Sequence, residues 1–368
     1  MQSWLITLKA FKIKSKLLNN LIYLIFVTAI TFSLLEISIR IYFGEEIFTL
    51  KDYRVSITEM DENGFPMYDE NLGWKQRPNM GNGGMITIDY GIRRSGPHQK
   101  VVKGAVLVSG SSFTGGSGVV DEEMWTSIVE RNSDNVVLNA AVGGYGLDQI
   151  ILRAKSLIDK LEPKFVIIDI QDVTIQWSSY SFLTYPKPYF TIKNNKPIRH
   201  HYPVPTMKTS DFANKDDDWL FVKYLKYSYM SHRIFSKYFP EIWFYKKWQK
   251  VVNRKDIDPV KLSCLLVRDF KEFLEERDLE FAIVSIPSGQ EYELRKKGKY
   301  LSQVEKCIRN YGINYIDYYD ELFQEIEKGS RTAFDFWDPH GNPPRAVGHP
   351  GKRGHEYIAN QVLKNLNF

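Results

Sequence analysis

The sequence contains only two cysteines, Cys264 and Cys307, among 368 residues. Two cysteines so far apart match neither the ligand spacing of a zinc site nor the dense pattern of a small disulfide-stabilised domain. One disulfide is compatible with the sequence, but two separate cysteines in a hydrophobic core are the expectation. The formal net charge of +5 is too small to indicate a nucleic-acid-binding protein, so no nucleic-acid partner is expected.

Motifs for binding nucleotide phosphates are also missing. The stretch 103–120 reads KGAVLVSGSSFTGGSGVV and is rich in glycine. A P-loop requires a lysine before its serine or threonine, and none is present here. A dinucleotide-binding turn requires G-x-G-x-x-G, and the glycines from Gly110 to Gly118 do not fit that spacing. The stretch therefore does not predict a nucleotide site, and no cofactor is expected.

The same stretch has the pattern of a strand that runs into a tight turn. Ala105–Val108 is a short apolar run with β-branched residues, which predicts a buried strand. Gly110 ends the run, Ser112 follows in the turn, and a helical pattern begins near Asp121, a suitable N-cap residue. This arrangement exposes a nucleophilic serine at the carboxyl edge of a parallel sheet. A purely structural turn is the alternative.

The amino-terminal segment has the pattern of a membrane anchor. Leu17–Phe43 is almost entirely apolar, and Glu36 and Arg40 lie one helical turn apart, where they can pair. The helix therefore reaches the ~20 residues that span a bilayer. The lysines of residues 1–16 place this basic tail in the cytoplasm and the rest of the chain outside, in the periplasm or at the cell surface. No A-x-A-like cleavage site was identified, so a signal anchor is expected; a buried helix of a soluble protein is the alternative.

Strand and helix patterns alternate through the rest of the chain. Further strands are predicted at Asn135–Ala141, Lys164–Ile170, Glu280–Ile286 and Ile313–Asp317. Helices are predicted at Leu147–Leu161, Asp258–Arg277, Lys299–Asn310 and Arg353–Leu366. This alternation predicts an α/β fold, with a parallel sheet and helices on both of its faces.

Two regions interrupt that alternation. Residues 44–100 are rich in turn formers and are expected to form an irregular stalk and lead-in to a domain over 101–368. Residues 178–257 form an insertion that is first rich in proline and then, from Trp219 to Lys255, aromatic and basic. A packed helical insertion is expected there. A lid over the substrate pocket and a surface near anionic lipid are the alternatives.

Two motifs resemble those of the SGNH/GDSL hydrolase superfamily. Gly110–Gly116 (GSSFTGG) resembles its first block, G-D-S-F-T-x-G, with Ser111 in the place of the aspartate. His349–His355 (HPGKRGH) resembles its last block, H-P-N-x-x-G-H. The resemblance covers roughly residues 20–368. It implies a membrane-anchored member of bacterial type, with the flavodoxin-like three-layer sheet of the SGNH fold.

The resemblance also implies roles for individual residues. Ser112 is the nucleophile and His349 the base, whereas His355 has a structural role. The oxyanion donors are the backbone N–H groups of Ser112 and Gly144, with Gly143 as the alternative to Gly144, and the side chain of Gln171. Gln171 stands where the superfamily pattern G-x-N-D has asparagine, in the stretch Asp169–Asp172.

The acid that should orient the histidine is missing from its usual position, which here holds Ala346 and Val347. Asp338 is the candidate to replace it. Alternatively, Asp338 and His340 are the working pair, or a Ser–His dyad acts without an acid. The adjacent histidines His200 and His201 lack nearby acids and are a poor metal site, so no metal is expected.

These residues predict a serine-dependent ester hydrolase or acyl (acetyl) transferase that acts on extracytoplasmic glycans through an acyl-Ser112 intermediate. The expected partners are an acyl ester or glycan substrate and, through the amino-terminal helix, membrane lipid. The alternative is a catalytically degenerate protein of the same superfamily that serves as a glycan-binding or assembly module.

Overall fold

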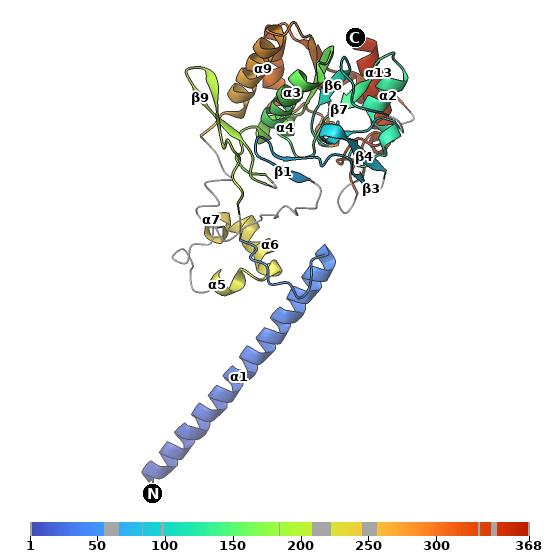
Figure 1. Ribbon diagram of the computed structural model, residues 1–368. Helices are drawn as coiled ribbons and strands as arrows, with labels where there is room; N and C mark the ends of the chain where they lie inside the picture. Colours follow the sequence, from blue (N-terminus) through green and yellow to red (C-terminus); the bar gives the residue numbers. More distant parts are fainter. Residues whose placement is uncertain are drawn as a thin grey trace. The chain divides into compact units, whose positions relative to one another are not determined.

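In the computed structural model (Figure 1), the chain forms two compact units. Unit 1 comprises Met1–Ile57 and Lys208–Lys250, and unit 2 comprises Thr58–Met207 and Val251–Phe368. The residues that the structure describes are 2–54, 66–82, 84–96, 99–183, 185–207, 222–244, 256–329, 332–339 and 344–366.

The described residues of unit 1 form one long helix and three short ones: α1 (Gln2–Phe43), α5 (Val222–Leu225), α6 (Tyr229–Tyr238) and α7 (Pro240–Trp243). The segment Leu18–Phe43 of α1 is long and apolar enough to cross a membrane, with a mean hydropathy of 2.1. The predicted pair within it is present, because Arg40 Nε lies 2.6 Å from Glu36 Oε1.

Unit 2 is built on a mixed sheet with the strand order β12-β11-β8-β6-β7-β5-β4-β3. Its parallel strands are β6 (Val106–Ser109), β7 (Val137–Asn139), β8 (Phe165–Ile170), β11 (Phe281–Ser285) and β12 (Asn314–Ile316). Each matches a strand predicted from the sequence. Numbered along the chain, these five strands have the order 2-1-3-4-5, which is the flavodoxin-like order expected.

The sheet separates two layers of helices, because successive strand residues point to opposite faces. One face packs against α3 (Leu147–Leu161), α4 (Asp172–Trp177), α9 (Pro259–Glu275) and α11 (Leu301–Asn310). The other packs against α2 (Trp125–Arg131), α12 (Tyr319–Lys328) and α13 (Lys352–Asn365). The short helix α10 (Gly289–Glu293) follows β11. The predicted helices and the three-layer architecture are confirmed.

Residues 67–93 are more regular than the expected stalk. They hold β1 (Met67–Asp69), β2 (Gly73–Lys75), β3 (Gly81–Asn82), β4 (Met85–Ile88) and β5 (Ile92–Arg93). The strands β3 to β5 run antiparallel and extend the main sheet beyond β7, whereas β1 and β2 form a separate hairpin. Strands of two to four residues are too short to produce a periodic pattern in the sequence.

Asp121 does not cap a helix, contrary to the expectation. A 3-10 turn covers Asp121–Glu123, and α2 begins only at Trp125. The buried Asp121 carboxylate instead accepts hydrogen bonds from Arg93 Nε at 2.8 Å and from the backbone N–H of Ile86 at 3.0 Å. Its partners come from β4 and β5, which the sequence pattern did not reveal.

The insertion 178–257 is divided between the two units. Its first part, in unit 2, contains the antiparallel hairpin of β9 (Tyr189–Lys193) and β10 (Lys196–His200). Its described second part, residues 222–244, belongs to unit 1 and forms the helices α5, α6 and α7.

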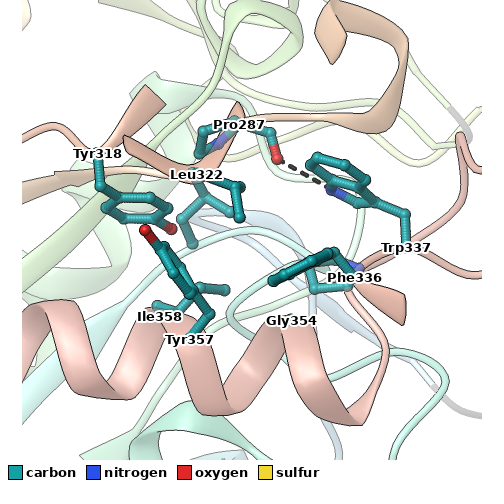
Figure 2. A pocket seen from close by; sticks show the side chains of 10 residues that line it. Pro287, Tyr318, Leu322, Phe336, Trp337, Gly354, Tyr357 and Ile358 are labelled. Carbon is teal, nitrogen blue, oxygen red and sulfur yellow. Dashed lines mark hydrogen bonds between the residues drawn. The ribbon is translucent and has the colours of Figure 1, made fainter. Parts of the chain in front are cut away.

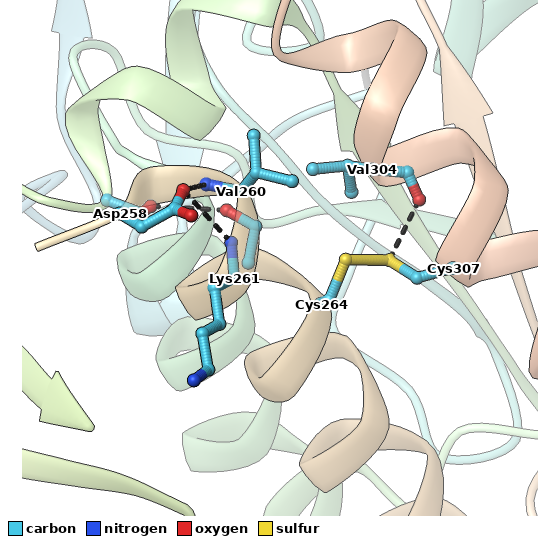
Figure 3. Close-up of a disulfide and its surroundings, with 8 residues drawn as sticks. Asp258, Val260, Lys261, Cys264, Val304 and Cys307 are labelled. Carbon is cyan, nitrogen blue, oxygen red and sulfur yellow. Dashed lines mark hydrogen bonds between the residues drawn. A yellow bond between two sulfur atoms is a disulfide. The ribbon is translucent and has the colours of Figure 1, made fainter. Parts of the chain in front are cut away.

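Cys264 and Cys307 form a disulfide, which corrects the expectation of two separate cysteines (Figure 3). Cys264 lies on α9 and Cys307 on α11, and their Cα atoms are 5.9 Å apart. The two helices pack side by side on one face of the sheet, which brings together residues that are 43 positions apart in the chain.

Candidate active site

The turn after β6 carries two adjacent serines in different environments. Ser111 is buried, whereas Ser112 is half-buried and reaches the surface. The turn is fixed by a hydrogen bond from the Gly115 N–H to the Ser111 carbonyl (2.8 Å) and by one from the Val142 N–H to the Gly110 carbonyl (3.0 Å). A side chain at Gly110 would overlap the carboxylate of Asp169, so only glycine fits there.

Ser112 lies within hydrogen-bond distance of His349. The Ser112 Oγ and His349 Nε2 atoms are 2.9 Å apart, although the residues are 237 positions apart in the chain. The imidazole also packs edge-on against the ring of Phe113, with 5.3 Å between ring centroids. An imidazole nitrogen at this distance can accept the proton of a serine that attacks a carbonyl.

The segment that carries His349 is fixed to the one that carries Asp338. The Asp338 N–H donates to the His349 carbonyl at 2.8 Å, and the Gly348 N–H donates to the Asp338 carbonyl at 3.0 Å. These two hydrogen bonds hold the backbone at Asp338 next to the backbone at Gly348 and His349, as expected if Asp338 is to approach the histidine. His340, the alternative base, lies outside the described residues.

Aromatic side chains of the core anchor the backbone on either side of this contact (Figure 2). The Trp337 indole N–H donates to the Pro287 carbonyl at 3.2 Å, and Trp337 also forms a β-bridge with Pro350. Phe336 and Trp337 are both buried between the sheet and α12 and α13. The buried residues that precede Asp338, and the bridge to Pro350 that follows His349, therefore limit the movement of both residues.

The carboxylate of Asp338 lies in a narrow space between glycines. A Cβ atom at Gly351 would come within 3.1 Å of Asp338 Oδ1, and one at Gly118 would be closer still to Oδ2. Burial raises the pKa of Asp338, and the charge of His349 opposes this shift. The carboxylate and the imidazole thus interact electrostatically.

The two glycines after β7 approach the nucleophile from another strand. A Cβ atom at Gly143 would lie 3.7 Å from the Ser112 Cβ atom. Gly144 has a φ of +79°, which L side chains rarely adopt, and a Cβ atom there would contact the Trp74 ring. The Trp74 indole N–H donates to the Gly143 carbonyl at 3.0 Å. This turn is therefore fixed close to Ser112, and the oxyanion role of Gly144 or Gly143 stays a prediction.

Gln171 reaches the nucleophile turn, but it contacts Ser111 there. Its side-chain Nε2 donates to the Ser111 Oγ atom at 2.9 Å, and both residues are buried. Gln171 comes directly after β8, so the parallel sheet brings it to the same edge as Ser112. The amide expected to serve an oxyanion is thus held by the residue preceding the nucleophile.

Asp169 stabilises the turn through hydrogen bonds from Ser111 and Thr114, a role that the sequence analysis missed. Its fully buried carboxylate accepts the backbone N–H of Ser111 at 3.0 Å and further hydrogen bonds from Thr114. Burial raises the pKa of Asp169 to about 6. The only signal in the sequence is an acidic residue within an otherwise apolar strand.

Arg93 was also missed, although it holds the loop after the nucleophile. The buried guanidinium donates to the carbonyls of Gly115, Gly116 and Val119, each at 2.6 Å, and pairs with Asp121. One arginine thus satisfies three loop carbonyls that would otherwise be poorly solvated. No sequence pattern predicted this, because the partners are backbone atoms.

Structural contacts hold other histidines in the described part of the chain. His355 accepts the Trp125 N–H through Nδ1 at 3.2 Å, and burial lowers the pKa of His355 to about 3. His200 contacts Thr191 Oγ1 at 2.8 Å, and His201 contacts the Lys187 carbonyl at 3.1 Å. Among the described residues, no group of three or more His, Cys, Asp or Glu side chains could hold a metal ion.

Neither a protein-family model nor a curated protein matches the chain. Among solved structures, it is similar to a two-domain esterase (CEX) active on acetylated mannans, with 13% identity and a TM-score of 0.38. That alignment covers 72% of this chain and 48% of the esterase, so this chain spans about half the length of the esterase.

Two further similar structures are covered by the alignment over nearly their whole length. One is a catalytic mutant of Axe2, an acetylxylan esterase from Geobacillus stearothermophilus (12% identity, 73% of this chain, 97% of that chain, TM-score 0.39). The other is a putative lipolytic protein of the G-D-S-L family from Desulfitobacterium hafniense (11% identity, 72% of this chain, 100% of that chain, TM-score 0.36). Two of these three similar structures are esterases, and the third is a putative lipolytic protein of the G-D-S-L family.

Proposed function

We propose that the protein is a serine-dependent esterase or acyltransferase of the SGNH/GDSL type. The observation that carries the proposal is the 2.9 Å contact between Ser112 Oγ and His349 Nε2. A serine hydroxyl is a poor nucleophile at neutral pH unless a neutral imidazole takes its proton. The pair forms between a strand-to-helix turn and the segment before α13, two places to which the resemblance independently assigns nucleophile and base.

In the first half-reaction, Ser112 Oγ attacks the carbonyl carbon of an ester, and its proton passes to His349 Nε2. The negative charge that forms on the carbonyl oxygen is stabilised by the backbone N–H groups of Ser112 and Gly144, with Gly143 as the alternative to Gly144, and by the side chain of Gln171 if its amide turns from Ser111 to the oxyanion. The intermediate collapses, the C–O bond to the alcohol breaks, and the alcohol leaves with the proton from His349. The acyl group remains on Ser112.

In the second half-reaction, a hydroxyl group attacks acyl-Ser112. His349 takes the proton of the attacking group and returns it to Ser112 Oγ as the acyl–serine bond breaks. With water as the acceptor the reaction is hydrolysis, and with a sugar hydroxyl it is acyl transfer. In both cases Asp338 is the positioning residue that favours the productive orientation of the His349 ring.

The proposed substrate is an acetyl ester on an extracytoplasmic glycan. The resemblance supports the substrate class, and the Cys264–Cys307 disulfide supports an oxidising compartment for unit 2. The lysines in the amino-terminal part of α1 support a cytoplasmic amino terminus, with the apolar segment Leu18–Phe43 of the same helix as the membrane anchor. Of two reporters fused after Phe368, one active only outside the cytoplasm and one active only inside it, the first should then give a signal and the second should not. Activity of a cytoplasm-only reporter would reverse the proposed topology.

The activity is tested with the purified full chain and a chromogenic acetyl ester, with and without an oligosaccharide acceptor. Ser112→Ala and His349→Ala should each reduce turnover by about 1,000-fold or more. The control Ser117→Ala, in the same loop, should retain it. Acetylated oligosaccharide as the product would identify a transferase, and acetate alone an esterase. Wild-type turnover no higher than that of Ser112→Ala would contradict the proposal.

One observation favours a second candidate, a degenerate glycan-binding module. The Gln171 amide, which should serve an oxyanion, is held by Ser111. Such a module would bind an acetylated oligosaccharide saturably without turning it over, and Ser112→Ala would leave its affinity unchanged.

A further inference from the structure

Unit 1 exposes many large apolar side chains outside α1. Its described residues 44–54 and 222–244 contain nine exposed large hydrophobic side chains, the same number as the much longer described part of unit 2. We call six of them the juxtamembrane patch: Phe48, Leu50, Tyr224, Ile234, Tyr238 and Phe239. Such a density of exposed apolar side chains indicates a surface that something covers.

The helix α6 has one face that packs against the core of unit 1 and another face that is exposed. Tyr229 and Phe235 point inward, to the small cluster around Trp243. Ile234, Lys237 and Tyr238 lie at positions i, i+3 and i+4 and are all exposed. The exposed face of α6 therefore differs from the usual polar face of a surface helix, because it combines apolar, aromatic and basic side chains.

The length of α1 places the start of α6 relative to a bilayer. The uncharged run from Leu18 to Leu35 is about 27 Å long at ~1.5 Å per residue. This nearly matches the ~30 Å hydrocarbon core of a bilayer, so the hydrocarbon ends close to Glu36. The Glu36 carboxylate accepts Ser228 Oγ at 2.8 Å and the Tyr229 N–H at 2.7 Å, at the amino-terminal end of α6. That end of α6 therefore lies at the level where the hydrocarbon ends.

Arg40 fixes the other parts of unit 1 at the same level. The side chain of Arg40 is only 5% exposed and pairs with Glu36 at 2.6 Å. It also donates to the carbonyls of Glu46 (2.7 Å), Thr49 (3.0 Å) and Tyr227 (2.7 Å). The end of α1, the segment after it and the α5–α6 turn are thus joined through one buried guanidinium.

The charges of the described surface suit an anionic partner. Lys223, Arg233 and Lys237 are exposed. The acids of residues 44–54 are held within the unit: Glu45 by Tyr53, Glu46 by Thr49 and Asp52 by Lys226. Aromatic rings mixed with lysine and arginine are typical of the headgroup layer, where rings sit at the boundary and basic side chains reach the phosphates.

We propose that the described part of unit 1 outside α1 is an interfacial collar. In it, the juxtamembrane patch and the side chains of Lys223, Arg233 and Lys237 lie in the headgroup layer of an anionic bilayer, beside the outer end of α1. This inference rests on the proposed membrane span of α1 and is independent of the esterase activity. It assigns residues 222–244, the described second part of the insertion, to lipid contact.

The test uses the full chain in lipid nanodiscs, with a polarity-sensitive probe attached to Tyr224→Cys or Phe239→Cys. Phe334→Cys, on unit 2, is the matched control, because Phe334 (53%) is as exposed as Phe239 (51%). A lipid spin-labelled at its headgroup should quench the probes at 224 and 239 several-fold more than the one at 334, and aqueous iodide should do the reverse. Probes at 224 and 239 that behave like the control would overturn the collar.

A probe at Phe26→Cys separates the collar from the membrane span itself. If a chain-labelled lipid quenches this probe while 224 and 239 stay open to iodide, α1 spans the membrane but the collar is wrong. If no probe is quenched by lipid, the membrane anchor fails as well. Shielding of 224 and 239 from iodide without lipid quenching would indicate a protein partner, such as a second copy, and would also overturn the collar.

The basic side chains are tested by charge reversal. The double variant Lys223→Glu/Lys237→Glu should reduce lipid quenching at 239 several-fold in discs containing phosphatidylglycerol and change it little in phosphatidylcholine alone. Lys193→Glu, an exposed lysine of unit 2, should have no effect. Equal quenching of the double variant and the wild type in both lipids would contradict the role of charge.

Discussion

The side-chain amide of Gln171 donates a hydrogen bond to the hydroxyl of Ser111, with 2.9 Å between Nε2 and Oγ. Both residues depart from the superfamily patterns, which have aspartate in place of Ser111 and asparagine in place of Gln171. The two departures therefore meet in one buried contact beside Ser112. The longer side chain of Gln171 is thus matched by a shorter side chain at Ser111.

If Gln171 serves the oxyanion, its loss should appear in turnover. Gln171→Ala should lower kcat on the order of 100-fold with little change in KM, because the donor acts on charge that develops in the transition state. Ser111→Ala should have a smaller effect, since it removes only the group that holds the amide. The double variant should cost no more than Gln171→Ala, because the two residues act through one contact. An unchanged kcat for Gln171→Ala, with normal thermal stability, would remove Gln171 from the site.

The role of Asp338 is tested by a substitution that keeps its shape. Asp338→Asn should lower kcat by about 10⁴-fold if the carboxylate orients the His349 ring, because an amide favours the wrong tautomer. A small effect at Asp338 with a large one for His349→Ala would indicate a Ser–His dyad. A large effect of His340→Ala with none of His349→Ala would transfer the base to His340. Initial rates on a chromogenic ester, with circular dichroism as a folding control, distinguish these outcomes.

Asp169 should make the stability of unit 2 depend on pH. The pKa of its carboxyl is about 6 in the folded protein and near 3.8 in an unfolded chain, so the folded state holds the proton more tightly. This contribution to stability is fully present below about pH 3.8 and is lost as pH rises through 6. Asp169→Asn removes the titration. The melting temperature of this variant relative to the wild type should therefore increase from pH 4 to pH 7, and a difference that is constant with pH would contradict the assignment.

The disulfide should stabilise unit 2 by restricting its unfolded state. It closes a loop with a sequence separation of 43, for which the chain-entropy estimate is about 3–4 kcal/mol. The double variant Cys264→Ala/Cys307→Ala should melt at a lower temperature than the wild type. A reductant should lower the melting temperature of the wild type towards that of the double variant and leave the double variant unchanged. Equal melting temperatures with and without reductant would show that the cysteines are not paired.

The parallel part of the sheet was predictable because its central strands are largely apolar runs. Val106–Ser109 and Phe165–Ile170 are buried on both faces, so their composition alone separates them from the amphipathic helices between them. The antiparallel extension from β3 to β5 was not predictable, since Gly81–Asn82 and Ile92–Arg93 are too short to carry a period. The same difficulty concealed Arg93 and, with it, the true partner of Asp121.

The contact between Ser112 and His349 could be anticipated, because both follow from motifs whose residue types are required by the chemistry. The contacts around them could not. Asp169 acts through the backbone of Ser111, and a backbone partner leaves no mark in the sequence. The pairing of Cys264 with Cys307 depends on the packing of α9 against α11, which a spacing of cysteines does not reveal.

Intact-protein mass spectrometry after exposure to a fluorophosphonate tests the central claim most directly. A fluorophosphonate phosphonylates only a serine that a neighbouring base activates, so it reports on Ser112 and His349 without requiring the natural substrate. The wild type should gain the mass of one adduct, mapped to Ser112, and Ser112→Ala should gain none. His349→Ala should label far more slowly, and Ser117→Ala should label like the wild type. An unlabelled wild type, an adduct on Ser111, or continued labelling of Ser112→Ala would contradict the account.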